Sequence, residues 1–245
     1  MRLRGEEPSP QQVQQLIEQE VKLASGCDRI ISVSEQEKQQ FVTNGLSNTE
    51  VLGHALQIFP TLNTFGQRKD ILFVGAIYEI DSPNADSVKW FAQDIFPKVQ
   101  ERLGQEIRLI IAGNNTVEQL IEEIGQLGNP SIQMLGKVDN LTRLYNNARL
   151  FVAPTRFAAG IPLKVYEAAA YGISIVTTSL IAKQLGWQHE VEILVADNPE
   201  KLAAECVKLY QDELLWQKLR SNALSRIQTE GSPSLFSEKL KSILT

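Results

Sequence analysis

Six short apolar runs, each followed by turn residues and then by a helical stretch, constrain the fold of this chain more than any other feature. Apolar and polar residues do not alternate within the runs, which is typical of strands buried on both faces of a parallel sheet. Strands that alternate with helices predict consecutive βα units. We therefore expect an α/β fold, a doubly wound, Rossmann-like parallel sheet of about six strands with its ligand outside their carboxyl ends. The runs are ILFVG, RLIIAG, SIQMLG, RLFVAP, SIVTT and EILVAD.

Helix start signals agree with this alternation. Asp81 or Ser82 can cap a helix that opens with Pro83, and Asn198 stands before Pro199 in the same way. Thr116 and Gln119 have the spacing of a capping box. Three further helical stretches follow residue 197.

The segment before residue 50 has a different organisation. Residues 11–24 carry a narrow apolar stripe at helical spacing. CDRIISVSE indicates a short strand, after which Ser34 can cap a helix that ends before Gly45. A second short strand is expected within EVLGHALQ.

Composition excludes several classes of function. The net charge is −5 and there is no run of lysine and arginine, so nucleic acid is not an expected partner. With two cysteines and two histidines the chain lacks the spacing of a zinc site, and no metal is expected. The N-terminus lacks the apolar core of a signal peptide, and no stretch approaches the ~20 apolar residues of a membrane span. We expect a cytoplasmic protein.

The stretch RFAAGIPLKVYEAAAYGISIVTT contains the strongest candidate site. Gly160 allows close backbone approach, and the first turn of the helix that Pro162 opens offers free N–H groups to an anion. Lys164 lies in that turn, where the helix dipole disfavours a cation by about 0.3–1 kcal/mol, so a bound phosphate would explain it. Glu167, one turn deeper, suits a sugar diol. The spacing is equally compatible with a surface pair of Lys164 and Glu167.

Other strand ends point to the same edge of the sheet. Gly75, Gly113 and Gly136 each end a predicted strand, where glycine serves either a plain turn or close ligand approach. Arg156 follows the fourth strand directly and can reach a phosphate or, equally, form a surface ion pair.

At this stretch the sequence resembles a known family. APTRFAAGIPLKVYEAAAYGISIVTTS is similar to the signature of the group 1 (family four) retaining glycosyltransferases of the GT-B fold. The resemblance covers roughly residues 50–230, and CDRIISVSEQEKQQF resembles the end of the family's N-terminal domain. The residues in the family's order and spacing are Arg156, Gly160, Lys164, Glu167, Ala168 and Gly172.

The resemblance implies two Rossmann-like domains facing a cleft, with a nucleotide-sugar donor held by the C-terminal one. It implies that Glu167 binds the ribose hydroxyls of the donor nucleotide. The diphosphate would be held by Lys164, Arg156 and the Gly160–Ile161 backbone, with Gly75 at the first strand end, while the loop at Lys137 and Val138 would lie against the base. Helix N–H groups and cations then stabilise the leaving diphosphate, so no metal or other cofactor is required.

Three departures from the family's pattern limit what carries over. Many relatives place an arginine and a lysine after the first strand of this domain, whereas here Gly75 is followed by AIYEIDSPN, so phosphate neutralisation would fall on Lys164 and Arg156. Many relatives have a glutamate where Ala159 stands, so the residues that touch the transferred sugar are unassigned. An acceptor-binding domain of about 150 residues would also have to precede residue 27. We therefore expect residues 1–49 to be a remnant of the acceptor domain and linker, and residues 50–245 to be the donor-binding domain of an excised half or a split subunit. The acceptor is unknown, and the missing domain would act in cis or in trans.

The expected function is transfer of a sugar from a nucleotide diphosphate to an acceptor. Two alternatives stay open. One is a half-protein that binds nucleotide sugars or another partner without catalysis, and the other is an epimerase or phosphorylase that shares the GT-B fold.

Overall fold

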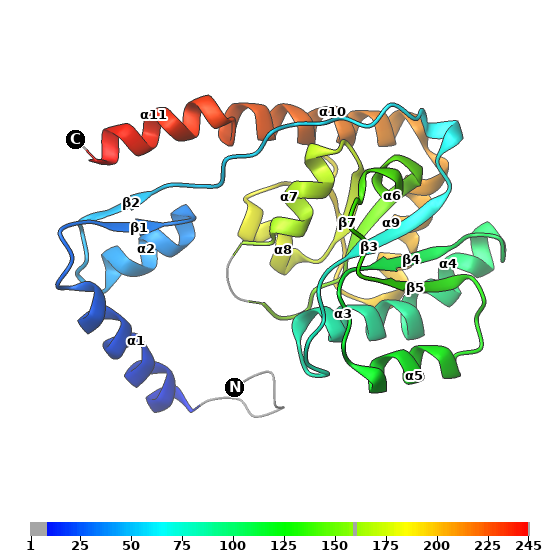
Figure 1. The fold of residues 1–245 in the computed structure, drawn as a ribbon, viewed down its shortest axis with the longest axis horizontal. Coiled ribbons are helices and arrows are strands. Elements are labelled where there is room, and N and C mark those ends of the chain that lie inside the picture. The colour runs from blue at the N-terminus through cyan, green and yellow to red at the C-terminus, as the bar shows by residue number, and fades with distance from the viewer. Residues whose placement is uncertain (1–8, 159–160, 245) are drawn as a thin grey trace.

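The computed structural model describes residues 9–158 and 161–244. Its main feature is a parallel six-stranded sheet in the order β5-β4-β3-β6-β7-β8, which confirms the predicted doubly wound α/β fold (Figure 1). The order reverses between β3 and β6, the two central strands, and ligands of such sheets bind at this point. The strands are β3 (Asp70–Val74), β4 (Leu109–Ala112), β5 (Ile132–Gly136), β6 (Ala148–Ala153), β7 (Ser174–Thr177) and β8 (Leu194–Val195).

Helices cover both faces of the sheet, which explains why the strand runs are apolar throughout. Ile71 and Phe73 of β3 join one buried cluster, and Leu72 and Val74 join the other. The first cluster packs under α3 (Pro83–Trp90), a π-helical turn (Phe91–Ile95), α4 (Phe96–Leu103), α5 (Glu118–Gln126) and α9 (Pro199–Gln211). The second packs under α6 (Thr142–Asn147), α7 (Leu163–Ala170) and α8 (Ser179–Leu185), while α10 (Glu213–Glu230) contributes to both.

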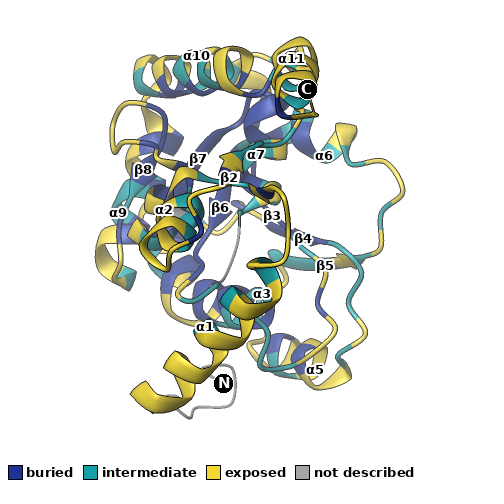
Figure 2. Ribbon diagram, turned by 90° about the vertical axis from the view of Figure 1, so that its left-hand side faces the viewer, coloured by how far each residue is buried: buried dark blue, intermediate teal, exposed yellow. Residues whose placement is uncertain are grey.

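A small lobe precedes this domain. Its strands β1 (Ile30–Ser32) and β2 (Thr49–Val51) pair in parallel, and α2 (Glu35–Thr43) connects them. Helix α1 (Pro10–Ala24), described throughout, has no buried residue and is exposed along its length (Figure 2). Helix α11 (Pro233–Leu244) extends from α10 towards the small lobe (Figure 1). Because β2 runs to residue 51, the small sheet crosses the expected boundary at residue 50 by two residues.

Most of the predicted helix starts are confirmed. The side chain of Ser82 caps α3, which opens with Pro83, and the side chain of Asn198 caps α9. Ser34 caps α2 as expected.

The predicted capping box of Thr116 and Gln119 is wrong. Helix α5 begins at Glu118, and the side chain of Asn115 accepts a hydrogen bond from Val117 N at 3.0 Å. Thr116 N donates to Ile77 O at 3.2 Å, so the chain before α5 is tied to the loop after β3. An Asn-based turn therefore replaces the cap.

Candidate functional site

A cavity of about 390 Å³ lies at the carboxyl ends of β3 and β6, where the strand order reverses. One wall comes from the segment after β3 and the start of α3, including Gly75, Ser82 and Asn84. The facing wall comes from the segment after β6 and the start of α7, including Thr155 and Lys164. The fold thus places the first turns of two helices on opposite sides of one cavity.

Lys164 is the cation of this cavity. Its Nζ donates to Asn84 Oδ1 at 2.6 Å and lies 4.7 Å from the centre of the Phe73 ring. Asn84 in turn donates from Nδ2 to Ala76 O at 2.8 Å, which fixes its amide. Burial lowers the pKa of Lys164 to about 8. Among the described side chains Lys164 therefore pairs with Asn84, across the cavity, and not with Glu167.

The starts of α3 and α7 add to the positive potential. The N–H groups of a first helical turn have no partner within the helix, and the helix dipole places partial positive charge there. Pro83 opens α3 and Pro162 precedes α7, so both turns begin at a proline beside the cavity. Together with Lys164, this arrangement suits a ligand with more than one negative charge.

Glu167 lies one turn further along α7 and does not line the cavity. Glu167 is exposed, yet partial burial of its carboxyl raises the pKa of that group, and the hydroxyl of Tyr145 partly offsets the rise. Gly75 packs against Asn84 within the other wall of the cavity, because a Cβ built on Gly75 would lie 2.9 Å from Asn84 Nδ2. A glycine here lets the amide of Asn84 reach its position.

Arg156, which follows β6, packs against α3 and does not line the cavity. Its guanidinium forms two hydrogen bonds with Asp86, Nε to Oδ2 at 3.0 Å and Nη2 to Oδ1 at 2.5 Å, and lies 4.9 Å from the Trp90 ring. This is the ion pair that the sequence allowed as the alternative to phosphate binding. Its role towards a ligand stays a prediction.

The remaining predicted site residues have different placements. Lys137 and Val138 do not line the cavity; Lys137 Nζ lies 3.8 Å from Asp139, and Val138 packs against the core near Tyr145. Ile161 lines the cavity, whereas Gly160 and Ala159 lie outside the described residues.

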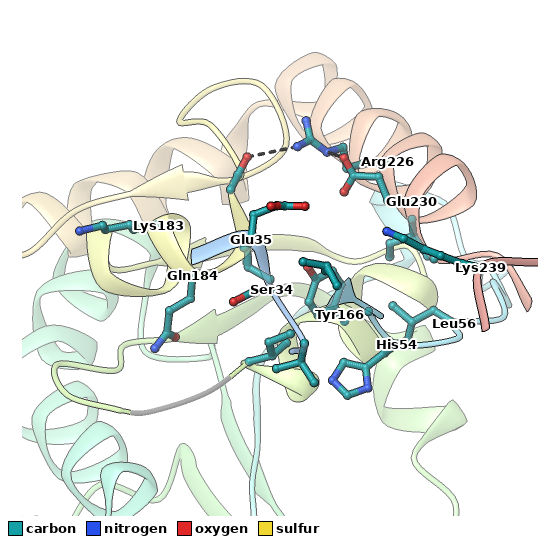
Figure 3. Close-up of a pocket in the computed structure, with 18 residues that line it drawn as sticks. Ser34, Glu35, His54, Leu56, Tyr166, Lys183, Gln184, Arg226, Glu230 and Lys239 are labelled. Carbon is teal, nitrogen blue, oxygen red and sulfur yellow. Dashed lines mark hydrogen bonds and ion pairs between the residues drawn. The ribbon is translucent and has the colours of Figure 1, made fainter. Parts of the chain in front are cut away.

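A second cleft of about 370 Å³ opens between the small lobe and helices α8, α10 and α11 (Figure 3). Ser34, Glu35 and His54 of the small lobe line one side. The other side carries Tyr166 and an ion pair of Arg226 with Glu230, Nε to Oε1 at 2.5 Å. Ile161 and Gln184 line both cavities, so the two adjoin.

Sequence reasoning missed Asn84 as a site residue. The signal was present, because Asn84 follows Pro83 at a predicted helix start directly after the first strand of the sheet. Its contact with Lys164 spans 80 positions and depends on β3 and β6 being neighbours.

The comparisons with known proteins agree with this fold. The family model "Glycosyl transferases group 1" matches residues 68–212. The chain belongs to this family. A curated Klebsiella pneumoniae protein, described as an uncharacterized 44.6 kDa protein in cps region, is 27% identical over 179 residues, which are 70% of this chain and 45% of that protein. The chain thus spans less than half the length of this curated relative.

Two solved structures have a similar fold. HepE from Anabaena, in complex with UDP and glucose, has a TM-score of 0.73 at 16% identity, over 93% of this chain and 66% of HepE. A variant of TarM from S. aureus, in a complex that includes UDP, has a TM-score of 0.77 at 14% identity, over 91% of this chain and 45% of TarM. At these identities the likeness concerns the GT-B fold of the family.

Two further findings concern metals and membranes. Over residues 9–158 and 161–244 no group of three or more His, Cys, Asp or Glu side chains is placed to hold a metal ion. In the same part of the chain, every helix is too short or too polar to span a bilayer.

Proposed function

We propose that this chain binds the nucleoside diphosphate of a nucleotide-sugar donor at the carboxyl edge of its six-stranded sheet. In a complete glycosyltransferase it would serve the transfer of the donor's sugar to an acceptor. The observation that carries the proposal is the cavity between the starts of α3 and α7, with Lys164 as its cation. Family membership and the UDP complexes of HepE and TarM support it.

The diphosphate would displace the contact between Lys164 and Asn84. Lys164 Nζ then donates to phosphate oxygens. Leu163 N and Val165 N already donate to Ile161 O and Pro162 O, so further donors would come from first-turn N–H groups without such a bond and from the helix dipoles. When the sugar leaves, negative charge grows on the diphosphate, and these fixed donors stabilise that charge without reorganisation.

The neighbouring cleft indicates where the sugar of the donor would lie. Because Ile161 and Gln184 line both cavities, a sugar attached to the diphosphate can extend towards the cleft. Glu167, one turn along α7, would accept hydrogen bonds from the ribose hydroxyls. The acceptor and the residues that contact the sugar would involve the acceptor-binding domain.

Calorimetric titration with UDP, GDP, dTDP and ADP tests the proposal. We expect micromolar to millimolar binding of at least one nucleotide, weakened about 10- to 100-fold by Lys164→Ala because a charge-assisted hydrogen bond is lost. Lys98→Ala is the matched control, since Lys98 forms only an exposed pair with Glu200 at 3.0 Å. Its affinity should equal that of the wild type.

Two results would contradict this function. One is the absence of binding by all four nucleotides, and the other is equal affinity in wild type and Lys164→Ala. Binding without sugar transfer, once the acceptor-binding domain is supplied, would favour a non-catalytic nucleotide-sugar-binding protein instead.

A further inference from the structure

Tyr145 is a buried aromatic residue beside the predicted ribose-binding glutamate. It lies on α6, its side chain is fully buried, and its ring stacks on Tyr171 with 4.5 Å between centres and 17° between planes. Tyr171 follows Glu167 by one helical turn, and Tyr171 N donates to Glu167 O at 3.1 Å. The stack therefore sets Tyr145 against the face of α7 that carries Glu167.

The hydroxyl of Tyr145 has an unusual environment. It is completely buried, and within the described residues it makes no hydrogen bond of normal geometry. A buried hydroxyl without a partner is destabilising, so its presence here calls for an acceptor nearby. The Glu167 carboxyl lies one turn before the Tyr171 ring on which Tyr145 stacks, and its charge acts on this hydroxyl.

We propose that Tyr145 is a positioning residue for Glu167. Its hydroxyl donates a hydrogen bond to one carboxylate oxygen and thereby turns the other oxygen towards the ribose diol of a bound nucleotide. The ribose part of this proposal rests on the proposed function, whereas the pair of Tyr145 and Glu167 does not.

The charges around the pair fit this assignment. Burial raises the pKa of Glu167, and the nearby Tyr145 hydroxyl lowers it, so the tyrosine favours the ionised carboxylate. Burial first and the charge of Glu167 next raise the pKa of Tyr145, so the hydroxyl keeps its proton and can act as a donor. Tyr171 and Arg68 also contact Tyr145, whereas Lys164, one turn before Glu167, is directed to Asn84.

The backbone of Tyr145 is held from the opposite side. Arg68, which is fully buried, donates from Nη1 to Tyr145 O at 2.9 Å and to Ala148 O at 3.0 Å. These bonds fix the end of α6, so the hydroxyl of Tyr145 has a defined position relative to α7.

The carboxyl titration of Glu167 tests the pair without any nucleotide. The protein is labelled with ¹³C-glutamate, Glu167→Gln assigns the signal, and the pKa is followed in wild type and Tyr145→Phe. We expect the pKa to rise by about one unit in Tyr145→Phe, because the hydrogen bond that favours the carboxylate is lost. Tyr171→Phe is the matched control, and its Glu167 pKa should equal that of wild type. Equal pKa values in wild type and Tyr145→Phe would overturn the proposal.

Nucleotide binding tests the orientation towards the ribose. Tyr145→Phe should weaken UDP binding about 3- to 10-fold, as expected for one lost orienting hydrogen bond, and leave 2′,3′-dideoxy-UDP binding unchanged. The pH at which UDP affinity falls on acidification should also move upward in this variant. Equal losses for both nucleotides would mean a merely structural role. If wild type does not bind UDP, the proposed function and the ribose role fail together, while the titration still decides the pair.

The variant is expected to fold, because phenylalanine keeps the stack on Tyr171 and removes a hydroxyl that lacks a normal hydrogen bond. Its melting temperature should stay within a few degrees of that of wild type, because only one hydrogen bond is lost. A melting temperature well below wild type would show that the hydroxyl stabilises the fold, and would overturn the positioning role.

Discussion

Two features of the fold disfavour the charged form of Lys164, and a bound diphosphate would offset both. Lys164 lies in the first turn of α7, where the helix dipole opposes a cation, and burial lowers its pKa to about 8. A phosphate beside Nζ would stabilise the charged form. The position of this lysine is therefore better explained by a ligand than by the stability of the ligand-free fold.

The first residue-scale prediction concerns pH. Because the Lys164 pKa of about 8 lies below the ordinary 10.5 and a bound diphosphate raises it, binding takes up protons above pH 8. UDP affinity should therefore fall as pH rises through about 8, by up to tenfold per pH unit. Calorimetry in buffers of different ionisation enthalpy measures both effects.

Lys164→Arg is the control for this pH dependence, since arginine stays charged throughout the range. Its affinity should be flat between about pH 7 and pH 9. A wild-type affinity that is equally flat would show that Lys164 does not contact the ligand.

The second residue-scale prediction concerns Arg68. Its buried guanidinium donates to Asn63 O, Tyr145 O and Ala148 O, and to Thr61 Oγ1 at 2.5 Å. Arg68→Ala should lower the free energy of unfolding by about 3–5 kcal/mol, because it leaves these acceptors without donors in a buried site. Lys98→Ala should change it by less than about 0.5 kcal/mol. Urea unfolding measures the free energy of unfolding of both variants. If Arg68→Ala lowers it no more than Lys98→Ala does, Arg68 does not stabilise the fold in this way.

At the residue scale the sequence predicted one side of each contact. The helix signals and the family's motif singled out Lys164 and Glu167. The partner of Lys164, Asn84, and the proposed partner of Glu167, Tyr145, come from other βα units, so neither pair can be found before the strand order and the tertiary packing are known. Arg156 illustrates the converse, since its ion pair with Asp86 spans 70 positions and cannot be read from local spacing.

At the scale of elements the βα alternation was predictable because both faces of each strand are buried, as in β3. The sequence predicted the type of fold, a doubly wound parallel sheet, but not the order of the strands within it. The start of α5 was predicted wrongly because Asn115 competes with Thr116 for the turn, and its backbone pairing with Ile77 is a tertiary contact.

The element-scale prediction concerns the ends of β3 and β4. Gly113 has φ of +134°, and a Cβ there would lie 2.2 Å from Gly75 O. Gly113→Ala should therefore lower the free energy of unfolding by about 2–3 kcal/mol or more. Because Gly75 lines the cavity, nucleotide affinity should fall as well.

Gly66→Ala is the matched control, since a Cβ there meets no atom within 4 Å. Gly66→Ala should change the free energy of unfolding by less than about 0.5 kcal/mol. Similar stabilities of the two variants in urea would show that the strand ends are not packed as described.

At the scale of the whole molecule, the cavity between α3 and α7 is formed by the domain that carries the six-stranded sheet. Its lining residues lie between Gly75 and Gln184, whereas the small lobe contributes to the neighbouring cleft. A chain of residues 50–245 should therefore bind UDP within about threefold of residues 1–245, as expected for a distant, independent segment. Calorimetric titration of both chains with UDP measures the two affinities. An unfolded fragment, or one that does not bind UDP when the longer chain does, would contradict this domain assignment.

The most direct test of the central claim is a crystal structure of the chain with UDP. We predict the diphosphate between the first turns of α3 and α7, with phosphate oxygens in hydrogen-bond contact with Lys164 Nζ and the ribose hydroxyls at Glu167. UDP bound in the cleft lined by Ser34, His54 and Tyr166, with the cavity at β3 and β6 empty, would contradict the account.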